Sequence, residues 1–295
     1  MSTLNHGGAR TAVLLGATRG IGRAAAVELA RGGWRTLLVG RDRAAGEALA
    51  ASLGGGARFL AADLSSLAEV RRLAAAVRAA APRVDLVVHS ADVLRSARVD
   101  TAEGIEVSFA TNFLGRVLFN HLALEGLADG AAIVHVAAAG FPGRLEAADI
   151  PPGPGVSAMS AHNLGQRAND AYGLELAERL RSRRVRVFVL HPGMVATGLR
   201  DSPEPRAWPV RLLVAALTWL ARPWTVTPED YARRLVAFLT GPASDTQHVL
   251  HDRSFRPLAP RRRFLDPSRR GAIWRRAHEA VGLPARGEVD PAAPE

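Results

Sequence analysis

The sequence predicts a doubly wound α/β fold, in which helices cover both faces of a parallel sheet. Short apolar segments alternate with Ala- and Leu-rich segments of helical periodicity, and Gly, Asp or Pro bound them. A glycine-rich turn follows the first apolar segment and leads into an Ala-rich helix. Strands buried on both faces read as continuous apolar runs, because helices exclude water from both sides. These observations together favour this fold class over an all-β or all-α fold.

The expected strands are, in chain order, residues 11–16, 35–40, 57–63, 84–90, 131–138 and 185–192. Residues 200–228 interrupt the alternation with a Pro-flanked apolar helix of about eleven to fourteen residues. We interpret them as a lid over a substrate pocket, in preference to contact with a membrane surface. A helix, the strand-like segment QHVLHD and a basic helix follow, and residues 285–295 are expected to be a disordered tail.

Length and composition limit the class of protein. A chain of 295 residues that is 48% hydrophobic can bury one large core, so a single domain over residues 1–295 is expected. No signal-peptide pattern is present, and no apolar run reaches the roughly 18 residues of a spanning helix. We therefore expect a soluble cytoplasmic protein. The chain has no Cys, which excludes disulfides, thiolate metal sites and cysteine nucleophiles.

The charge pattern does not indicate nucleic-acid binding. The net charge is +10, yet all 38 basic residues are Arg and are spread along the whole chain, which indicates a compositional bias. The dense run PRRRFLDPSRRGAIWRR is interpreted as a solvated basic segment. A metal site is not expected either, since His89, His135 and His191 near strand ends lack paired ligand spacing. No Ser-His-Asp arrangement with a nucleophile elbow is present.

The glycine-rich turn predicts a Rossmann-type dinucleotide site. Gly16, Gly20 and Gly22 have the spacing G-x-x-x-G-x-G, which allows a tight turn and close approach of a pyrophosphate to a helix N-terminus. Arg41 stands after the second strand, where NAD-specific sheets usually carry an acid. Its planar fork of donors suits a 2'-phosphate, and Arg19 can join it, so NADP(H) is the predicted cofactor. The alternative is a solvated loop arginine.

On these residues the chain resembles the short-chain dehydrogenase/reductase family, and within it the retinol-dehydrogenase-like group, from Thr11 to Leu283. Further motifs that carry the resemblance are ADL, TNFLG, LHPGMVATGL and IWRRAHEAVGL. The resemblance implies that Asp63 and Leu64 flank the adenine, and that the segment after the sixth strand lies beside the nicotinamide carboxamide. The cofactor-binding residues predicted in this way are Gly16, Thr18, Arg19, Gly20, Ile21, Gly22, Arg41, Asp63, Leu64, Ser90, Ala91, Pro192, Gly193, Val195 and Thr197. A homodimer through the long helices after the fourth and fifth strands is also compatible with it.

The resemblance implies a proton relay whose residues this chain lacks. In the family a Tyr exchanges the proton at the substrate oxygen, a Lys four residues later lowers the Tyr pKa and holds the ribose, and a Ser positions the oxygen. These positions align with His162, Gln166 and Ala138, so all three groups are replaced. No register restores them, because the chain contains no Lys. Tyr172 lies ten residues past His162, about 15 Å further along the helix.

A fourth departure lies after the fourth strand. The family's Asn-Asn-Ala-Gly is HSAD here, which puts Asp92 at a glycine position. We expect the side chain of Asp92 to crowd the nicotinamide ribose or its carboxylate to repel a phosphate.

The remaining groups predict a different acid/base centre. An imidazole with a pKa of roughly 6.5 can donate or accept a proton near neutrality, so His162 is the candidate for the role of the Tyr. Gln166, one helical turn away, can hydrogen-bond the imidazole or a ribose hydroxyl and fix the tautomer. Asn112, the family's Asn in N-x-x-G, can orient a water or a substrate carbonyl. The alternative is that His162 only fills the space of the Tyr.

Three functions remain open at this point. The first is an atypical NADP(H)-dependent oxidoreductase acting on a hydrophobic small molecule, with His162, Asn112 and Gln166 as the catalytic residues. The second is a non-redox enzyme that uses the same pocket for dehydration, cyclisation or isomerisation. The third is a non-catalytic protein that senses the cofactor or binds a partner, because a fold does not fix a function.

Overall fold

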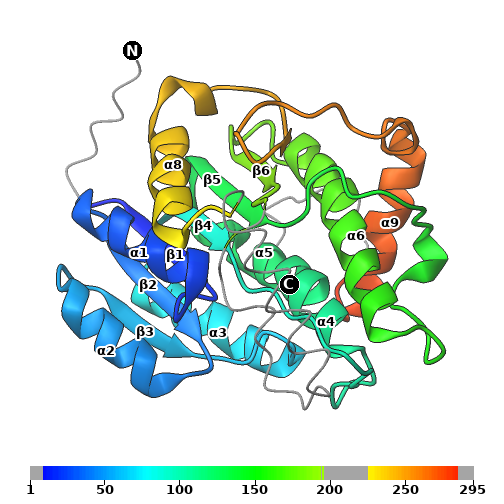
Figure 1. The fold of residues 1–295 in the computed structure, drawn as a ribbon, viewed down its shortest axis with the longest axis horizontal. Coiled ribbons are helices and arrows are strands. Elements are labelled where there is room, and N and C mark those ends of the chain that lie inside the picture. Colours follow the sequence, from blue (N-terminus) through cyan, green and yellow to red (C-terminus); the bar gives the residue numbers. More distant parts are fainter. Residues whose placement is uncertain (1–8, 194, 196–224, 285–295) are drawn as a thin grey trace.

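The computed structural model describes residues 9–193, 195 and 225–284 and shows a parallel sheet between two layers of helices (Figure 1). Its seven strands have the order β3-β2-β1-β4-β5-β6-β7. The strands are β1 (Thr11–Leu15), β2 (Arg35–Gly40), β3 (Arg58–Ala61), β4 (Val84–His89), β5 (Leu127–Val136), β6 (Arg186–Leu190) and β7 (Leu250–His251). The predicted fold class is confirmed. Thr197, residues 200–224 of the predicted lid and the tail 285–295 lie outside the described residues.

Helices cover both faces of the sheet and divide the core into two clusters. One cluster contains Leu29, Leu49 and Tyr231, and the other contains Leu73 and Tyr172. The helices are α1 (Gly20–Arg31), α2 (Arg43–Leu53), α3 (Leu67–Ala80), α4 (Val107–Phe109), α5 (Gly115–Ala123), α6 (Ala158–Arg179), α8 (Pro228–Thr240) and α9 (Pro267–Ala280). No helix among the described residues is both long and apolar enough to cross a membrane.

The strand order reverses between β1 and β4, which places a crevice at their carboxyl ends. In register, Leu15 of β1 pairs with His89 of β4, and His89 pairs with His135 of β5. Dinucleotides bind at such a switch point in open parallel sheets, because the loops from the two neighbouring strands diverge there. The segments that follow β1, β4, β5 and β6 therefore define the region where a site is expected.

Most strand boundaries differ from the sequence prediction by one or two residues, and two strands differ more. β5 begins at Leu127 instead of 131, because Val84 pairs with Leu127 across an irregularity that the turn-like residues Asp129 and Gly130 conceal in the sequence. The strand-like segment QHVLHD forms only the two-residue strand β7, which pairs in parallel with β6.

The C-terminal helix α9 packs along α6 (Figure 1). The Trp274 ring stacks on the Tyr172 ring with centroids 5.0 Å apart and an 8° angle between their planes. Glu175 of α6 accepts from both Arg179 and Arg270, at 2.8 and 3.3 Å. This contact excludes Tyr172 from any acid/base role. It also covers part of α6 with the chain's own helix, so the homodimer stays a prediction.

Candidate active site at the carboxyl ends of β1, β4 and β5

The glycine turn after β1 has no room for side chains. Gly16 has a φ of +93°, and a Cβ there would lie 2.5 Å from the Ala91 nitrogen. A Cβ on Gly22 would lie 2.2 Å from the Gly16 oxygen and 2.3 Å from the Ser90 hydroxyl. Gly20 also has a positive φ, +55°. The turn thus depends on glycine for packing as well as for backbone conformation.

The N-terminus of α1 has no side-chain cap from its N-cap residue. The residue preceding the helix, Arg19, makes no side-chain capping bond, and the first turn carries no acid. By contrast, a side-chain oxygen caps each of five other helices, namely Asp42, Ser66, Ser157, Thr227 and Asp266. A helix start with free N–H groups and no nearby acid is what a bound phosphate requires.

The predicted adenosine-side residues lie after β2 and β3. Arg41 approaches Asp63 at 3.8 Å, and their side chains are 55% and 37% exposed. Such an exposed pair contributes little, about 0–1 kcal/mol, so Arg41 can reorient toward a ligand. The carboxylate of Asp63 also accepts from the main-chain nitrogen and the hydroxyl of Ser65, at 2.9 and 2.7 Å, which fixes its orientation.

The predicted residues after β4 and β6 support the walls of the crevice. The Ser90 hydroxyl donates to the Leu15 oxygen at 3.0 Å and joins the ends of β4 and β1. Gly193, which has a φ of +72°, donates its N–H to Nδ1 of His191 at 2.9 Å. Val195 forms a bridge with Val226.

Asn112 lies in a single π-helical turn, Ala110–Leu114, which separates α4 from α5. π-bulges of this kind occur often at functional sites. The amide of Asn112 is fully buried: its Oδ1 accepts from the Val93 N–H and its Nδ2 donates to the Val93 oxygen, both at 2.8 Å. Asn112 therefore fixes the main chain just after Asp92, and its predicted contact with a water or substrate carbonyl stays a prediction.

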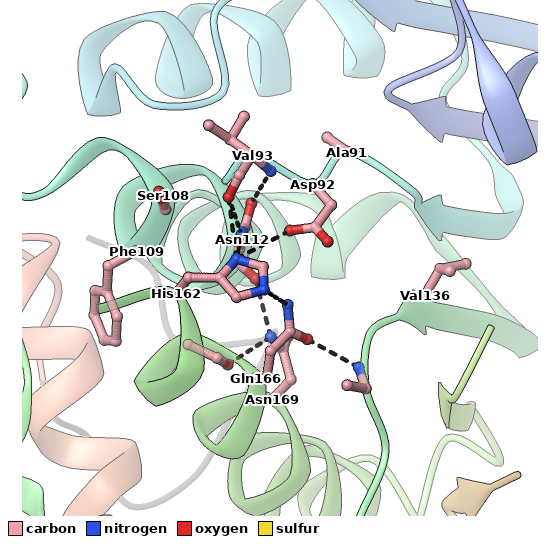
Figure 2. A network of polar contacts seen from close by, with 12 residues as sticks. Ala91, Asp92, Val93, Ser108, Phe109, Asn112, Val136, His162, Gln166 and Asn169 are labelled. Atoms are coloured by element: carbon pink, nitrogen blue, oxygen red, sulfur yellow. Dashed lines mark hydrogen bonds and ion pairs between the residues drawn. The ribbon is translucent and has the colours of Figure 1, made fainter. Parts of the chain in front are cut away.

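His162 lies in the first turns of α6 and faces this fixed segment (Figure 2). Its Nδ1 is 3.1 Å from the Val93 oxygen, 3.1 Å from Nδ2 of Asn112 and 3.6 Å from Oδ1 of Asp92. Its Nε2 is 3.3 Å from Nε2 of Gln166. The structure thus brings together the three residues predicted as catalytic, and adds Asp92 to them.

The surroundings of His162 select one neutral tautomer. Oε1 of Gln166 accepts from the Ala138 N–H at 2.8 Å, so the NH₂ group of Gln166 must face the imidazole. An NH₂ group can only donate, so Nε2 of His162 is the unprotonated nitrogen. Nδ1 faces two acceptors, the Val93 oxygen and Asp92, and one donor, Nδ2 of Asn112 at 3.1 Å. Because Nδ2 of Asn112 already donates to the Val93 oxygen at the shorter distance of 2.8 Å, Nδ1 of His162 is assigned the hydrogen. The ring therefore offers a basic Nε2.

One face of α6 also holds the segment that follows β5. Gln166 binds the N–H of Ala138, and one turn later Oδ2 of Asp170 accepts from the N–H of Gly140 at 2.9 Å. Burial raises the pKa of Asp170 to about 7. The two positions that the sequence prediction aligns with the family's Ser and Lys are thus joined directly, since the Gln166 side chain binds the backbone at Ala138.

Asp92 points at His162. Its side chain is 29% exposed, and burial raises the pKa of its carboxyl, while the facing His162 and Arg116 lower it. The expected crowding of a ribose stays a prediction, but the contact with His162 was not foreseen. Glycine has no side chain at this position in the family pattern, so only the tertiary structure shows what its replacement touches.

Sequence reasoning also missed a buried hydrogen-bonded chain beneath the site. Asn169 donates to the oxygens of Asn112 and Gly165, which leaves its Oδ1 to accept from Nδ1 of His135 at 2.9 Å. Nε2 of His135 then accepts from Nδ2 of Asn120 at 3.0 Å, and Oδ1 of Asn120 accepts from Nε2 of His89 at 2.7 Å. The chain links β4, α5, β5 and α6 and requires His135 to be neutral, because this ring donates through one nitrogen and accepts at the other.

A sequence signal for these residues existed. Asn112, Arg116 and Asn120 are spaced four apart in an otherwise apolar segment, so they share one buried helix face. Buried polar groups need partners, so such a stripe predicts a polar network beneath it. The described residues contain no group of three His, Cys, Asp or Glu placed to hold a metal.

Comparison with known proteins identifies the family. The family profile described as enoyl-(acyl carrier protein) reductase matches residues 16–248. Dehydrogenase/reductase SDR family member 13 of Bos taurus is 36% identical over 221 residues, which cover 72% of this chain and 58% of that protein. Retinol dehydrogenase 14 of Mus musculus is 33% identical over 214 residues, covering 66% of this chain and 64% of that protein. The chain therefore belongs to the short-chain dehydrogenase/reductase family, within its retinol-dehydrogenase-like group.

A bacterial relative matches over nearly the full length. DnrU of Streptomyces sp. (strain C5), named as a daunorubicin C-13 ketoreductase, is 31% identical over 290 residues, covering 95% of this chain and 96% of that protein. By contrast, the chain spans less than two thirds of the length of the two mammalian relatives, 58% and 64%.

Proposed function

We propose that this protein is an NADP(H)-dependent oxidoreductase that interconverts a hydrophobic alcohol and its carbonyl compound, with His162 as the acid/base. The observation that carries the proposal is the fixed tautomer of His162. Gln166 donates to Nε2 and so keeps it the basic nitrogen, while the Val93 oxygen and Asp92 lie beside Nδ1. An imidazole held in this way can perform the proton transfer that a Tyr performs in the family.

The residues at the phosphate end fit a dinucleotide. The glycine turn excludes side chains, and the uncapped start of α1 offers free N–H groups to a pyrophosphate. Arg41 and Arg19 are exposed, and Arg suits a 2'-phosphate through its planar fork of donors. At the nicotinamide end the fit is weaker, because Gln166 is engaged with Ala138 and His162 and no Lys holds the ribose.

The proton step follows from the groups in place. When bound, the cofactor exchanges a hydride with the substrate carbon. As an alcohol is oxidised, its hydroxyl proton passes to Nε2 of His162, and the O–H electron pair becomes the second bond of the carbonyl. The resulting imidazolium is stabilised by the Asp92 carboxylate near Nδ1. In the reverse direction the imidazolium returns this proton to the forming alkoxide.

The names of two relatives support a hydrophobic substrate. One is named for retinol and the other for the C-13 keto group of daunorubicin, and both compounds carry large apolar frameworks. The apolar sequence at 200–228, of which residues 200–224 lie outside the described residues, suits contact with such a framework.

The test begins with cofactor binding and continues with labelled hydride. Calorimetric titration should show tighter binding of NADPH than of NADH, and Arg41→Ala should remove that preference. Arg43→Ala is the matched control, because Arg43 is an exposed neighbour that pairs with Glu47 at 3.1 Å. NADPH deuterated at C4 should then transfer label to a ketone from a hydrophobic panel. The proposal fails if label never reaches any product.

A second candidate function rests on the contact between Asp92 and His162. A carboxyl 3.6 Å from an imidazole resembles the paired groups that move protons without redox chemistry, as in dehydration or isomerisation. Turnover that needs no nicotinamide but is lost in His162→Ala would favour this function. Turnover that strictly requires the cofactor would favour the oxidoreductase.

A further inference from the structure

Arg116 is a buried cation at the centre of the site that none of the predicted site residues accounts for. It lies on α5, one turn after Asn112, and is only 3% exposed. Its guanidinium donates to the Ala91 oxygen at 2.7 Å and, through two nitrogens, to the Val136 oxygen at 3.2 Å. Its Nε is buried without a hydrogen-bond partner. Arg116 thus joins the carboxyl ends of β4 and β5.

A buried guanidinium needs a compensating charge. Carbonyl oxygens satisfy its hydrogen bonds, but burial of an unpaired charge is costly, and here it lowers the pKa of Arg116 to about 10. None of the ion pairs formed by the described residues includes Arg116. The one acid that favours its charged form is Asp92, which directly follows Ala91 in the chain. The Arg116 guanidinium therefore binds the oxygen of the peptide bond that joins Ala91 to Asp92.

The ionised form of the Asp92 carboxyl likewise needs opposite charge nearby. Its Oδ1 is buried without a hydrogen-bond partner and lies 3.6 Å from Nδ1 of His162. Burial raises the pKa of this carboxyl, and two charged or titratable groups oppose that effect: His162 on α6 and Arg116 on α5. Arg116 is the permanent charge of the two, because a guanidinium stays protonated whereas an imidazole gains and loses its charge near neutral pH.

We propose that Arg116 is a positioning residue whose buried charge keeps Asp92 in its carboxylate form opposite His162. Gln166, at the position of the family's Lys, is neutral, and Arg116 returns a fixed positive charge to the site from a different helix. The catalytic consequence rests on the proposed function. The imidazolium formed when His162 takes up a proton needs a negative partner, and a protonated Asp92 would not supply one.

A purely mechanical role for Arg116 is the competing explanation. In that case its bonds to the Ala91 and Val136 oxygens would hold two strands together, and the charge would be incidental. Arg183 offers a matched control for this role. It donates to the Leu124 and Leu127 oxygens and so clamps the start of β5, but it does not face Asp92.

The decisive measurement is the titration of the Asp92 carboxyl by ¹³C NMR in the full chain. Arg116→Gln, which keeps a donor and removes the charge, should raise the pKa of Asp92 by about one unit or more. Arg116→Lys, which keeps the charge and loses the fork, should restore most of the difference, and Arg183→Gln should leave the titration unchanged. An Asp92 titration that is the same in Arg116→Gln as in the unaltered protein would overturn the proposal.

A second variant covers the case in which Arg116→Gln does not fold. Asp92→Asn keeps the shape of the side chain and removes only its charge, so it should lower the melting temperature at neutral pH by several degrees, because Arg116 stays buried without its partner. An unchanged melting temperature would mean that Asp92 carries no charge there, which also overturns the proposal.

Turnover gives a third readout. In Arg116→Gln, kcat should fall several-fold near neutral pH and recover as the pH rises, with KM little changed. In Asp92→Asn, kcat should be low throughout, and adding Arg116→Gln should lower it no further. The ¹³C titration needs no turnover, so a failure of the oxidoreductase proposal would leave the inference about Arg116 separately testable.

Discussion

The two ends of the crevice differ in what builds them. The phosphate end, around the turn after β1, consists of main chain: glycines that exclude side chains and a helix start without a cap. The reaction end, around α6, consists of side chains, among them Ala138, His162 and Gln166, which the sequence prediction aligns with the family's Ser, Tyr and Lys. A site made of backbone survives substitution as long as the turn keeps its shape, whereas a site made of side chains can change its chemistry on an unchanged scaffold.

The reaction end nevertheless keeps an ordered arrangement of polar groups. Asn112 fixes Val93, Gln166 fixes Ala138, and Asp170 fixes Gly140, each through a main-chain hydrogen bond. Buried polar networks are stable only when their members are partnered. This order supports an altered active site over a pocket in which His162 merely fills space.

The largest expected effect is on turnover at the reaction end. His162→Ala should lower kcat about 10²- to 10⁴-fold, because it removes the general acid/base, and NADPH binding should change little. Steady-state kinetics and calorimetry on the same preparation measure both quantities. His248→Ala is the control, since His248 is exposed on a distant loop. Full activity in His162→Ala would exclude this residue as the acid/base.

The next largest effect belongs to the phosphate end. Gly22→Ala places a Cβ against the main chain of Gly16, so we expect a loss of about 1–3 kcal/mol in stability or in NADPH binding. Thermal melts with and without NADPH separate the two. Gly32→Ala, directly after the last residue of the same helix, is the matched control, because its Cβ would have no contact shorter than 3.4 Å. Equal effects of the two substitutions would contradict the packing argument.

Acid should weaken the scaffold of the reaction end. Burial lowers the pKa of His135 from its ordinary 6.5 to about 3, and also lowers that of His89. The native state therefore keeps both rings neutral while the unfolded chain takes up protons, so the free energy of unfolding falls as the pH drops below about 6.5. The His135 ring should account for about 2 kcal/mol of this loss between pH 6.5 and about 5.

Urea denaturation at about pH 7 and about pH 5 measures this loss. His135→Gln should reduce the difference between the two pH values by the contribution of one ring, whereas His248→Gln should not, because His248 is exposed. If His135→Gln showed the same pH dependence as the unaltered protein, His135 would have to be protonated in the native state.

The smallest expected effect is on NADPH affinity, and it tests whether Asp92 at the reaction end of the crevice weakens binding of the cofactor. Asp92→Gly restores the family's glycine, so it should tighten NADPH binding several-fold, about 1 kcal/mol, while turnover falls because His162 loses its partner. Asp92→Asn separates charge from size, since it removes the charge and keeps the volume. Weaker NADPH binding in Asp92→Gly would show that the carboxyl assists the cofactor instead of opposing it.

Much of the fold could be predicted from the sequence, because apolar runs and glycine spacing are local signals. The six predicted strands are all present, and the glycine turn follows β1. The start of β5 was missed because Leu127 pairs with Val84 across an irregularity that no local pattern reveals. At the site, His162 and Gln166 could be aligned by motif, but the partners of Asp92 could not, because they come from other elements.

The sequence by itself determined the family, the position of the glycine turn and the absence of any Lys, since each depends on which residue stands at which place in the chain. Only the tertiary structure decided which nitrogen of His162 is basic, that Asp92 faces this ring, and that Arg116 lies buried beside Asp92. The physical reason is that ionisation and tautomer depend on burial and on contacts between residues distant in the chain, here from β4, α5, β5 and α6.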